Sequence, residues 1–115
     1  MKALSIHPFY VDQILSGEKT IEYRTWFTHY RGDLLICATA KKKKGTISGH
    51  ALCVVTLTDI QQGLYNYEWL LSDIRFIRPI PLKGKLNLWN YDGEIEYLPG
   101  ISYKDYMETY KELIT

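Results

Sequence analysis

The chain has 115 residues, of which 46% are hydrophobic and 23% are charged, and its formal net charge is +1. This length allows one domain with a single hydrophobic core and excludes two such domains, so we expect a single domain over residues 1–115. The near-neutral charge excludes a general electrostatic attraction to nucleic acid, but it leaves room for a local basic patch. Ten tyrosines and three tryptophans suit either a small barrel core or a stacking surface for bases.

The N-terminal segment predicts a short strand followed by a short helix. Residues 3–6 form a strand candidate, and Pro8 suits the first position of a helix, where its missing N–H costs nothing. Hydrophobic residues then recur at helical spacing, at Val11, Ile14 and Leu15. Gly17 falls where a left-handed C-terminal cap belongs, so we predict a helix over residues 8–16.

Charged residues crowd the segment that follows this helix. A strand predicted over residues 20–24 places Ile21 and Tyr23 on one face, toward the core, and Glu22 and Arg24 on the other face. Charged groups leave water only when they are paired, so these two side chains either pair with each other or face a ligand.

The middle of the chain predicts further strands. A strong strand candidate over residues 34–39 is joined to the longest one, over residues 49–60, by the basic tip 41–44. This tip reads as a solvated hairpin loop, with a contact for phosphates as the alternative. We expect residues 61–68 to form a loop and residues 69–71 to form a helical turn.

The last third predicts two more strands and a helix. Residues 74–81 alternate in polarity and contain two prolines, which predict an edge or terminal strand. Another alternating strand follows over residues 86–91, and the C-terminal helix is predicted over residues 102–114, with Ser102 as its cap. Five or six short strands with one early and one late helix indicate an α+β fold, a small mixed β-barrel.

Cysteine usage and hydropathy bear on the compartment. Cys37 and Cys53 lie inside apolar runs, so we expect buried free thiols in a reducing compartment, with a disulfide between neighbouring strands as the alternative. The N-terminus lacks the apolar region of a signal peptide, and no apolar run approaches membrane-spanning length, so we expect a cytoplasmic protein without membrane contact. The histidines and cysteines show no metal-ligand spacing, and we expect neither a metal nor a cofactor.

Three charged residues near the first helix are the main site candidates. Lys19 would act as a base or nucleophile if it is partly withdrawn from water, or as a donor to phosphate or carbonyl groups if it is not; a solvated lysine is the alternative. Glu22 and Arg24 form either a structural ion pair or a unit in which Arg24 binds phosphate while Glu22 orients it. Aromatic residues just past this segment offer a stacking surface or pack in the core: Trp26, Phe27 and Tyr30.

The pattern Gly17-x-Lys19-x-x-Glu22-x-Arg24 resembles the signature G-x-K-x-x-E-x-R of the ASCH domain family, a branch of the PUA-like superfamily. A downstream block occurs in an order similar to many members of this family: Trp69, Asp73-Ile74-Arg75, Pro79-x-Pro81-x-Lys83-Gly84 and Leu88-Trp89. The resemblance covers roughly residues 3–89. It implies a β-barrel with helices closing one side and a ligand cleft lined by the signature.

The resemblance implies RNA or nucleotide binding, often in a coactivator or translation context. The family that the chain resembles also includes a few enzymes. One group hydrolyses the acetyl amide of N4-acetylcytidine with a Lys, a Thr and a Glu, and a ribonuclease activity has been proposed for another group. Lys19 matches that lysine, but Glu22 stands where those amidohydrolases carry the threonine. This departure favours recognition over catalysis.

We therefore expect a binding module that recognises single-stranded RNA or a modified nucleoside through Lys19, Glu22 and Arg24, with Trp26 and Tyr30 as stacking partners. The alternative is a small hydrolase of a nucleoside amide or an RNA phosphodiester, with Lys19 as base or nucleophile and Glu22 as proton shuttle. A third interpretation is a regulatory domain that binds protein partners through its aromatic loops. A basic rim around the cleft is predicted from Arg31, Lys41, Lys42, Lys43, Lys44, Lys83 and Lys85.

Overall fold

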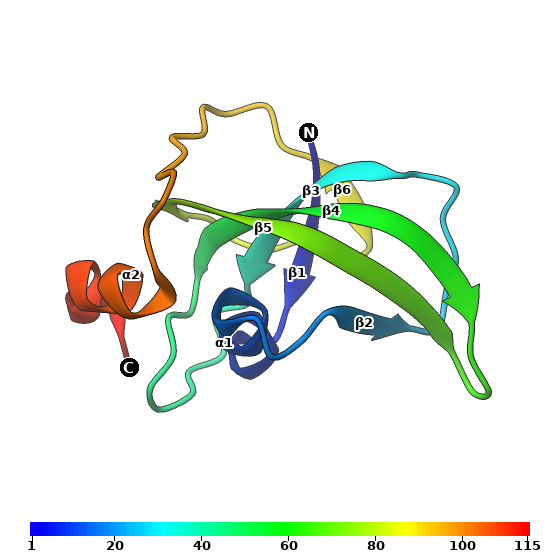
Figure 1. The fold of residues 1–115 in the computed structure, drawn as a ribbon, viewed down its shortest axis with the longest axis horizontal. Coiled ribbons are helices and arrows are strands. Elements are labelled where there is room, and N and C mark those ends of the chain that lie inside the picture. Colours follow the sequence, from blue (N-terminus) through cyan, green and yellow to red (C-terminus); the bar gives the residue numbers. More distant parts are fainter.

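The computed structural model describes residues 1–115 and folds into one curved sheet flanked by helices (Figure 1). The strands are β1 (Lys2–Ile6), β2 (Ile21–Arg24), β3 (Gly32–Ala38), β4 (His50–Gln62), β5 (Tyr67–Pro81) and β6 (Leu88–Asn90), and the helices are α1 (Pro8–Ser16), α2 (Tyr103–Thr109) and the single 3-10 turn η1 (Lys111–Leu113). The strand order is β2-β5-β4-β3-β1-β6, in which only the β1–β3 pair is parallel. This mixed half-barrel confirms the predicted α+β small-barrel class.

The curvature of the sheet comes from its two longest strands, β4 and β5, which arch across the molecule (Figure 1). Their register shifts at three places, and such bulges bend a strand and increase its twist. At one of them Thr56 pairs with Ser72 and Val54 pairs with Arg75, so two residues of β5 oppose one residue of β4. Asp73, one of the two, has a φ of +53°, a left-handed conformation that aspartate tolerates better than most residues.

Helix α1 has the bounds that the sequence predicts. Pro8 occupies its first turn, and His7 caps it, with Nδ1 accepting the Phe9 N–H at 3.0 Å. Gly17 ends the helix with a φ of +86° and donates its N–H to the Ile14 carbonyl, as a left-handed cap does. The apolar side of the helix is buried against the sheet: Pro8, Val11, Ile14 and Leu15.

Three predicted elements differ from the structure. Residues 69–71, predicted as a helical turn, belong to β5, because Trp69 pairs with Glu22 of β2 while Trp69 and Leu71 point into the core. The predicted loop 61–68 is also shorter in the structure, because β4 extends to Gln62 and β5 begins at Tyr67, which leaves residues 63–66 as the hairpin connection. The C-terminal helix is shorter than predicted, since α2 ends at Thr109 and the chain continues as the 3-10 turn η1. The predicted strand 86–91 shortens to β6.

The second half of β5 contains the two prolines and was predicted as an edge or terminal strand; no other strand of the sheet pairs with it on the side away from β4. Strand β2 pairs only with the first part of β5, from Tyr67 to Leu70. Beyond it, residues 96–98 lie along the same side of β5: the Arg78 N–H donates to the Glu96 carbonyl, the Leu98 N–H donates to the Phe76 carbonyl, and Ile77 forms an isolated bridge with Tyr97. Pro79 and Pro81 follow this bridge at the end of β5, where a missing N–H is tolerated. None of the helices is long and apolar enough to cross a membrane.

Both cysteines are buried free thiols, which confirms one of the two alternatives drawn from the sequence. Burial raises the pKa of the Cys37 thiol to about 12, and burial, followed by the charge of Cys37, raises the pKa of the Cys53 thiol well above its usual range. Thiolate, the reactive form, is therefore scarce in the folded protein.

We expect neither thiol to react with a disulfide reagent such as DTNB at about pH 8 while the protein is folded. Both thiols should react in denaturant, and the released thiolate should correspond to two equivalents per chain. Rapid reaction of either cysteine in the native protein, measured by absorbance, would contradict the buried placement.

Candidate functional site

Glu22 is the centre of the charged cluster. Its side chain is buried, with 7% of the residue exposed, and its carboxylate lies between two cations. Oε1 is 3.4 Å from Lys19 Nζ, and Oε2 accepts a hydrogen bond of 2.9 Å from Arg24 Nε. The signature thus forms one ion network, in which two cations offset the cost of burying the carboxylate.

The predicted orientation of β2 is wrong. Tyr23, expected in the core, is 50% exposed, whereas Glu22, expected on the outer face, is buried. The reason lies in the partner strand, because Glu22 pairs directly with the fully buried Trp69 of β5 and residues paired in this way share a face of the sheet. Pairing with β5, rather than side-chain hydrophobicity, decides which face of β2 turns inward.

Arg24 reaches from β2 to β1. Its Nη2 donates a hydrogen bond of 2.8 Å to the Ser5 carbonyl, while its Nε holds Glu22. The pairing of β6 with β1 ends at Leu4, so the Ser5 carbonyl lies beyond the last ladder pair on that side. Since β1 and β2 are not neighbours in the sheet, the Arg24 side chain links two strands that no backbone ladder joins.

Lys19 lies between two aromatic rings. Its Nζ is 5.2 Å from the ring centre of Tyr10 and 5.1 Å from that of Tyr23, in addition to its contact with Glu22. All three contacts depend on the positive charge of the ammonium group. These four residues line a cleft of about 420 Å³, the signature cleft.

The sequence did not single out the two tyrosines of the signature cleft. Tyr10 is 47% exposed and projects from α1, and Tyr23 is 50% exposed on β2. Tyr10 could have been found as a large aromatic residue next to Val11, on the side of the amphipathic helix that does not face the core. Tyr23 could not, because its aromatic character itself predicted burial.

The two aromatic residues predicted as stacking partners lie outside the signature cleft. Trp26 packs edge-to-face on Trp69, with ring centres 4.8 Å apart, and joins the hydrophobic core. The Tyr30 hydroxyl donates to the Asp33 carbonyl, and burial, followed by the charge of Asp33, raises the pKa of Tyr30. Both contacts describe structural packing, and a role in ligand binding remains a prediction for these two residues.

The predicted basic rim separates into distinct groups. Arg31 precedes β3, pairs with Asp59 at 3.5 Å and donates to backbone carbonyls, whereas the lysines 41–44 follow β3 at its other end. Lys41, Lys42 and Lys43 line a second concave surface of about 430 Å³, here called the lysine cleft, together with His7, Phe9 and Tyr10. Lys44 is exposed in the same loop.

Lys83 and Lys85 lie in an exposed loop near the end of β1. Leu82 donates its N–H to the Gly49 carbonyl, and Gly84 approaches Ser5 so closely that a Cβ at position 84 would lie 2.2 Å from Ser5 Oγ. Neither lysine lines the signature cleft or the lysine cleft.

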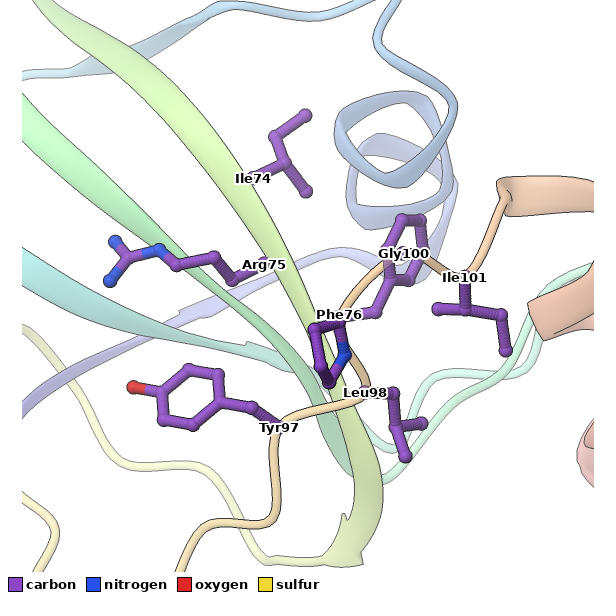
Figure 2. A pocket seen from close by; sticks show the side chains of 8 residues that line it. Ile74, Arg75, Phe76, Tyr97, Leu98, Gly100 and Ile101 are labelled. Atoms are coloured by element: carbon purple, nitrogen blue, oxygen red, sulfur yellow. The ribbon is translucent and has the colours of Figure 1, made fainter.

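The largest cavity, about 590 Å³, lies elsewhere, between the middle of β5 and residues 97–101 (Figure 2). Its walls are mainly apolar, and Figure 2 shows the guanidinium of Arg75 extending away from Leu98 and Ile101. Arg75 is bound by Asp33 at 2.9 Å and by Asp73 at 3.3 Å, so its charge is balanced within the protein. No group of three or more His, Cys, Asp or Glu side chains is placed to hold a metal ion.

Together these features define a small α+β half-barrel domain with a charged cleft beside its first helix. The chain belongs to the ASCH domain family, because the family model described as ASCH domain matches residues 4–113. The resemblance inferred from the signature is thereby confirmed.

Solved structures share this fold. The structure of ASCH from Zymomonas mobilis is 18% identical, with a TM-score of 0.62 over 99% of this chain and 95% of that chain. A tyrosine-to-phenylalanine mutant of the same protein is 19% identical, with a TM-score of 0.63 over 99% and 98% of the two chains. A serine-to-alanine mutant of that protein is 19% identical, with a TM-score of 0.63 over 99% of this chain and 96% of that chain. Comparison with curated proteins gives no match.

Proposed function

We propose that this ASCH domain binds RNA or a modified nucleoside in the signature cleft. The observation that carries this proposal is a charged donor, Lys19, placed between the exposed rings of Tyr10 and Tyr23, with the acceptor Glu22 beside it in the same cleft. Unstacked bases are recognised by hydrogen bonds along their edges combined with stacking on aromatic side chains, and this cleft offers both. We also propose a cytoplasmic location, which was predicted from the free thiols and from the hydropathy of the chain.

The contacts of Lys19 favour recognition over hydrolysis. A base or nucleophile must present an unprotonated amine, which would give up the ion pair with Glu22 and the attraction of both tyrosine rings. Glu22 is held by Lys19 and Arg24 at once, so proton transfer through it would leave two cations without their partner. The network is therefore better suited to hold a ligand than to turn one over.

The test is a calorimetric titration with nucleosides, N4-acetylcytidine among them, and with mixed single-stranded RNA. Tyr23→Ala should weaken binding by about 1–3 kcal/mol, the usual contribution of one stacked base. Tyr65→Ala is the matched control, because Tyr65 is 90% exposed at the β4–β5 hairpin tip and lines neither cleft. Equal affinities for these two variants would contradict the placement of the site.

The same samples also test the alternative function, hydrolysis of a nucleoside amide or of RNA. Incubation with N4-acetylcytidine and RNA, followed by chromatography, should return the substrates unchanged. Product that forms with the wild-type protein and disappears with Lys19→Ala would replace binding by catalysis as the function of this cleft.

A further inference from the structure

The lysine cleft adjoins the signature cleft, and Tyr10 lines both. On one side, the Tyr10 ring lies 5.2 Å from Lys19 Nζ. On the other side, it contacts Phe9 edge-to-face, with ring centres 5.3 Å apart, and approaches the His7 ring at 6.2 Å. A ligand that fills both clefts must therefore cross Tyr10.

The lysine cleft carries uncompensated positive charge. Lys41, Lys42 and Lys43 are exposed, and no acidic side chain lines the cleft. None of these lysines has a carboxylate partner within 4.0 Å, although lysines elsewhere in the chain do. Lys43 Nζ lies 5.9 Å from the Phe9 ring centre, so the charge extends along the aromatic wall. A concave surface of this kind attracts an anion.

The N-terminus of α1 does not supply the anion site itself. Pro8 has no N–H, the Phe9 N–H is bound by His7 Nδ1, and the next two amides donate to the His7 carbonyl. Anion binding at this place therefore depends on the lysine side chains. Because His7 Nδ1 is an acceptor, the neutral imidazole carries its proton on Nε2 and can add one donor.

We propose that the ligand is a strand of RNA rather than a free nucleoside, and that it crosses Tyr10 from the signature cleft to the lysine cleft. One base occupies the signature cleft, and the adjoining phosphates contact Lys41, Lys42 and Lys43. Alternation of exposed aromatic rings with cations is how proteins hold single strands, since bases stack on the rings and phosphates meet the cations. This inference rests on the proposed function of the signature cleft and extends it to the class of ligand.

The test compares three proteins: the wild type, the combined variant Lys41→Gln, Lys42→Gln, Lys43→Gln, and a control of equal charge change, Lys2→Gln, Arg78→Gln, Lys104→Gln. The control residues line neither cleft. Affinity for mixed single-stranded RNA is measured by fluorescence anisotropy at several salt concentrations. The lysine-cleft variant should bind RNA about 10- to 100-fold more weakly, and its salt slope should fall by about two units, at roughly 0.7 unit for each of three lost phosphate contacts.

The outcomes separate the two proposals. Nucleoside affinity, set by the signature cleft, should stay within about twofold in the lysine-cleft variant, and Tyr10→Ala should weaken both nucleoside and RNA binding by about tenfold. Nucleoside binding with an RNA salt slope equal to that of the control overturns the inference and leaves the proposed function standing. If polyglutamate binds as tightly as RNA, the inference is also overturned, because the negative charge of the ligand alone would then explain its binding to the lysine cleft. Absence of both nucleoside and RNA binding overturns the proposed function.

Discussion

Glu22→Gln is expected to lower the free energy of unfolding by about 2–4 kcal/mol, because it leaves two cations without their buried partner. Glutamine matches the size of glutamate but has no charge, so Lys19 and Arg24 would face each other across a neutral amide. The expected loss is somewhat below that of a fully enclosed pair, since the Lys19 and Arg24 side chains remain 13% and 23% exposed. Urea denaturation followed by tryptophan fluorescence measures it.

A matched control uses the same substitution on an exposed pair. Glu96 lies 3.8 Å from Arg78, and both side chains are more than half exposed. Glu96→Gln should therefore change stability by only about 0–1 kcal/mol. Similar losses for the two variants would show that the Glu22 network is no more than another surface ion pair.

The second large effect concerns Tyr106 of α2, which fastens the C-terminal helix to the sheet. Tyr106 is fully buried, and its hydroxyl donates to the Ile77 carbonyl at 2.7 Å, with the Leu52 carbonyl at 3.2 Å. Its ring packs between Phe76 and Tyr110, with ring centres 4.7 and 5.0 Å away. One side chain thus joins α2 to both β4 and β5.

Alkaline pH should destabilise the protein through this tyrosine. Burial, followed by the charges of Cys53 and Tyr110, raises the pKa of Tyr106 far above its ordinary value of 10.0. The folded protein therefore holds this proton more tightly than the unfolded chain, so its stabilising contribution is fully present below pH 10 and is lost as the pH rises further. Burial raises the pKa of Tyr103 and of Cys37 to about 12 each, which adds to the loss above their ordinary values of 10.0 and 9.0.

Tyr106→Phe should separate the contribution of Tyr106 from the others. Below about pH 9 the variant should be less stable by about 1–2 kcal/mol, because the lost hydroxyl leaves a buried carbonyl without its donor. Above pH 10 the wild type should lose about 1.4 kcal/mol more than the variant for each further pH unit. Urea denaturation at several pH values measures both effects, and Tyr65→Phe at the exposed hairpin tip is the control. Parallel stability curves for wild type and variant would contradict the coupling.

Local signals in the sequence predict local structure well. Helix α1 follows from Pro8 at its start, Gly17 at its end and three hydrophobic residues at helical spacing, and all of these act within one or two turns. The signature gave the family, and the same segment contains the charged network. Its residues are close in sequence, so their proximity required no knowledge of the fold.

Features that depend on distant pairing escaped prediction. Alternation along β2 defines two faces, but only pairing with Trp69 of β5 decides that Glu22 turns inward and Tyr23 outward. The run Trp69 to Leu71 is too short for its period to distinguish a strand from a helical turn. Tyr10 belongs to the candidate site because its ring on α1 lies beside Lys19, and no local sequence pattern predicts this contact.

The link between Arg24 and the Ser5 carbonyl connects the charged network around Glu22 to the closure of the barrel. The guanidinium that bridges β2 and β1 is also the one that holds Glu22, so the proposed ligand of Glu22 would act on the same hydrogen bonds that join the two strands. This coupling is thermodynamically reciprocal. A ligand that strengthens the Glu22–Arg24 pair would stabilise the contact between the two strands, and a change that destabilises this contact would lower the affinity for the ligand by the same free energy. Under the proposed function, ligand affinity and the stability of the contact between β1 and β2 are therefore coupled in this small domain.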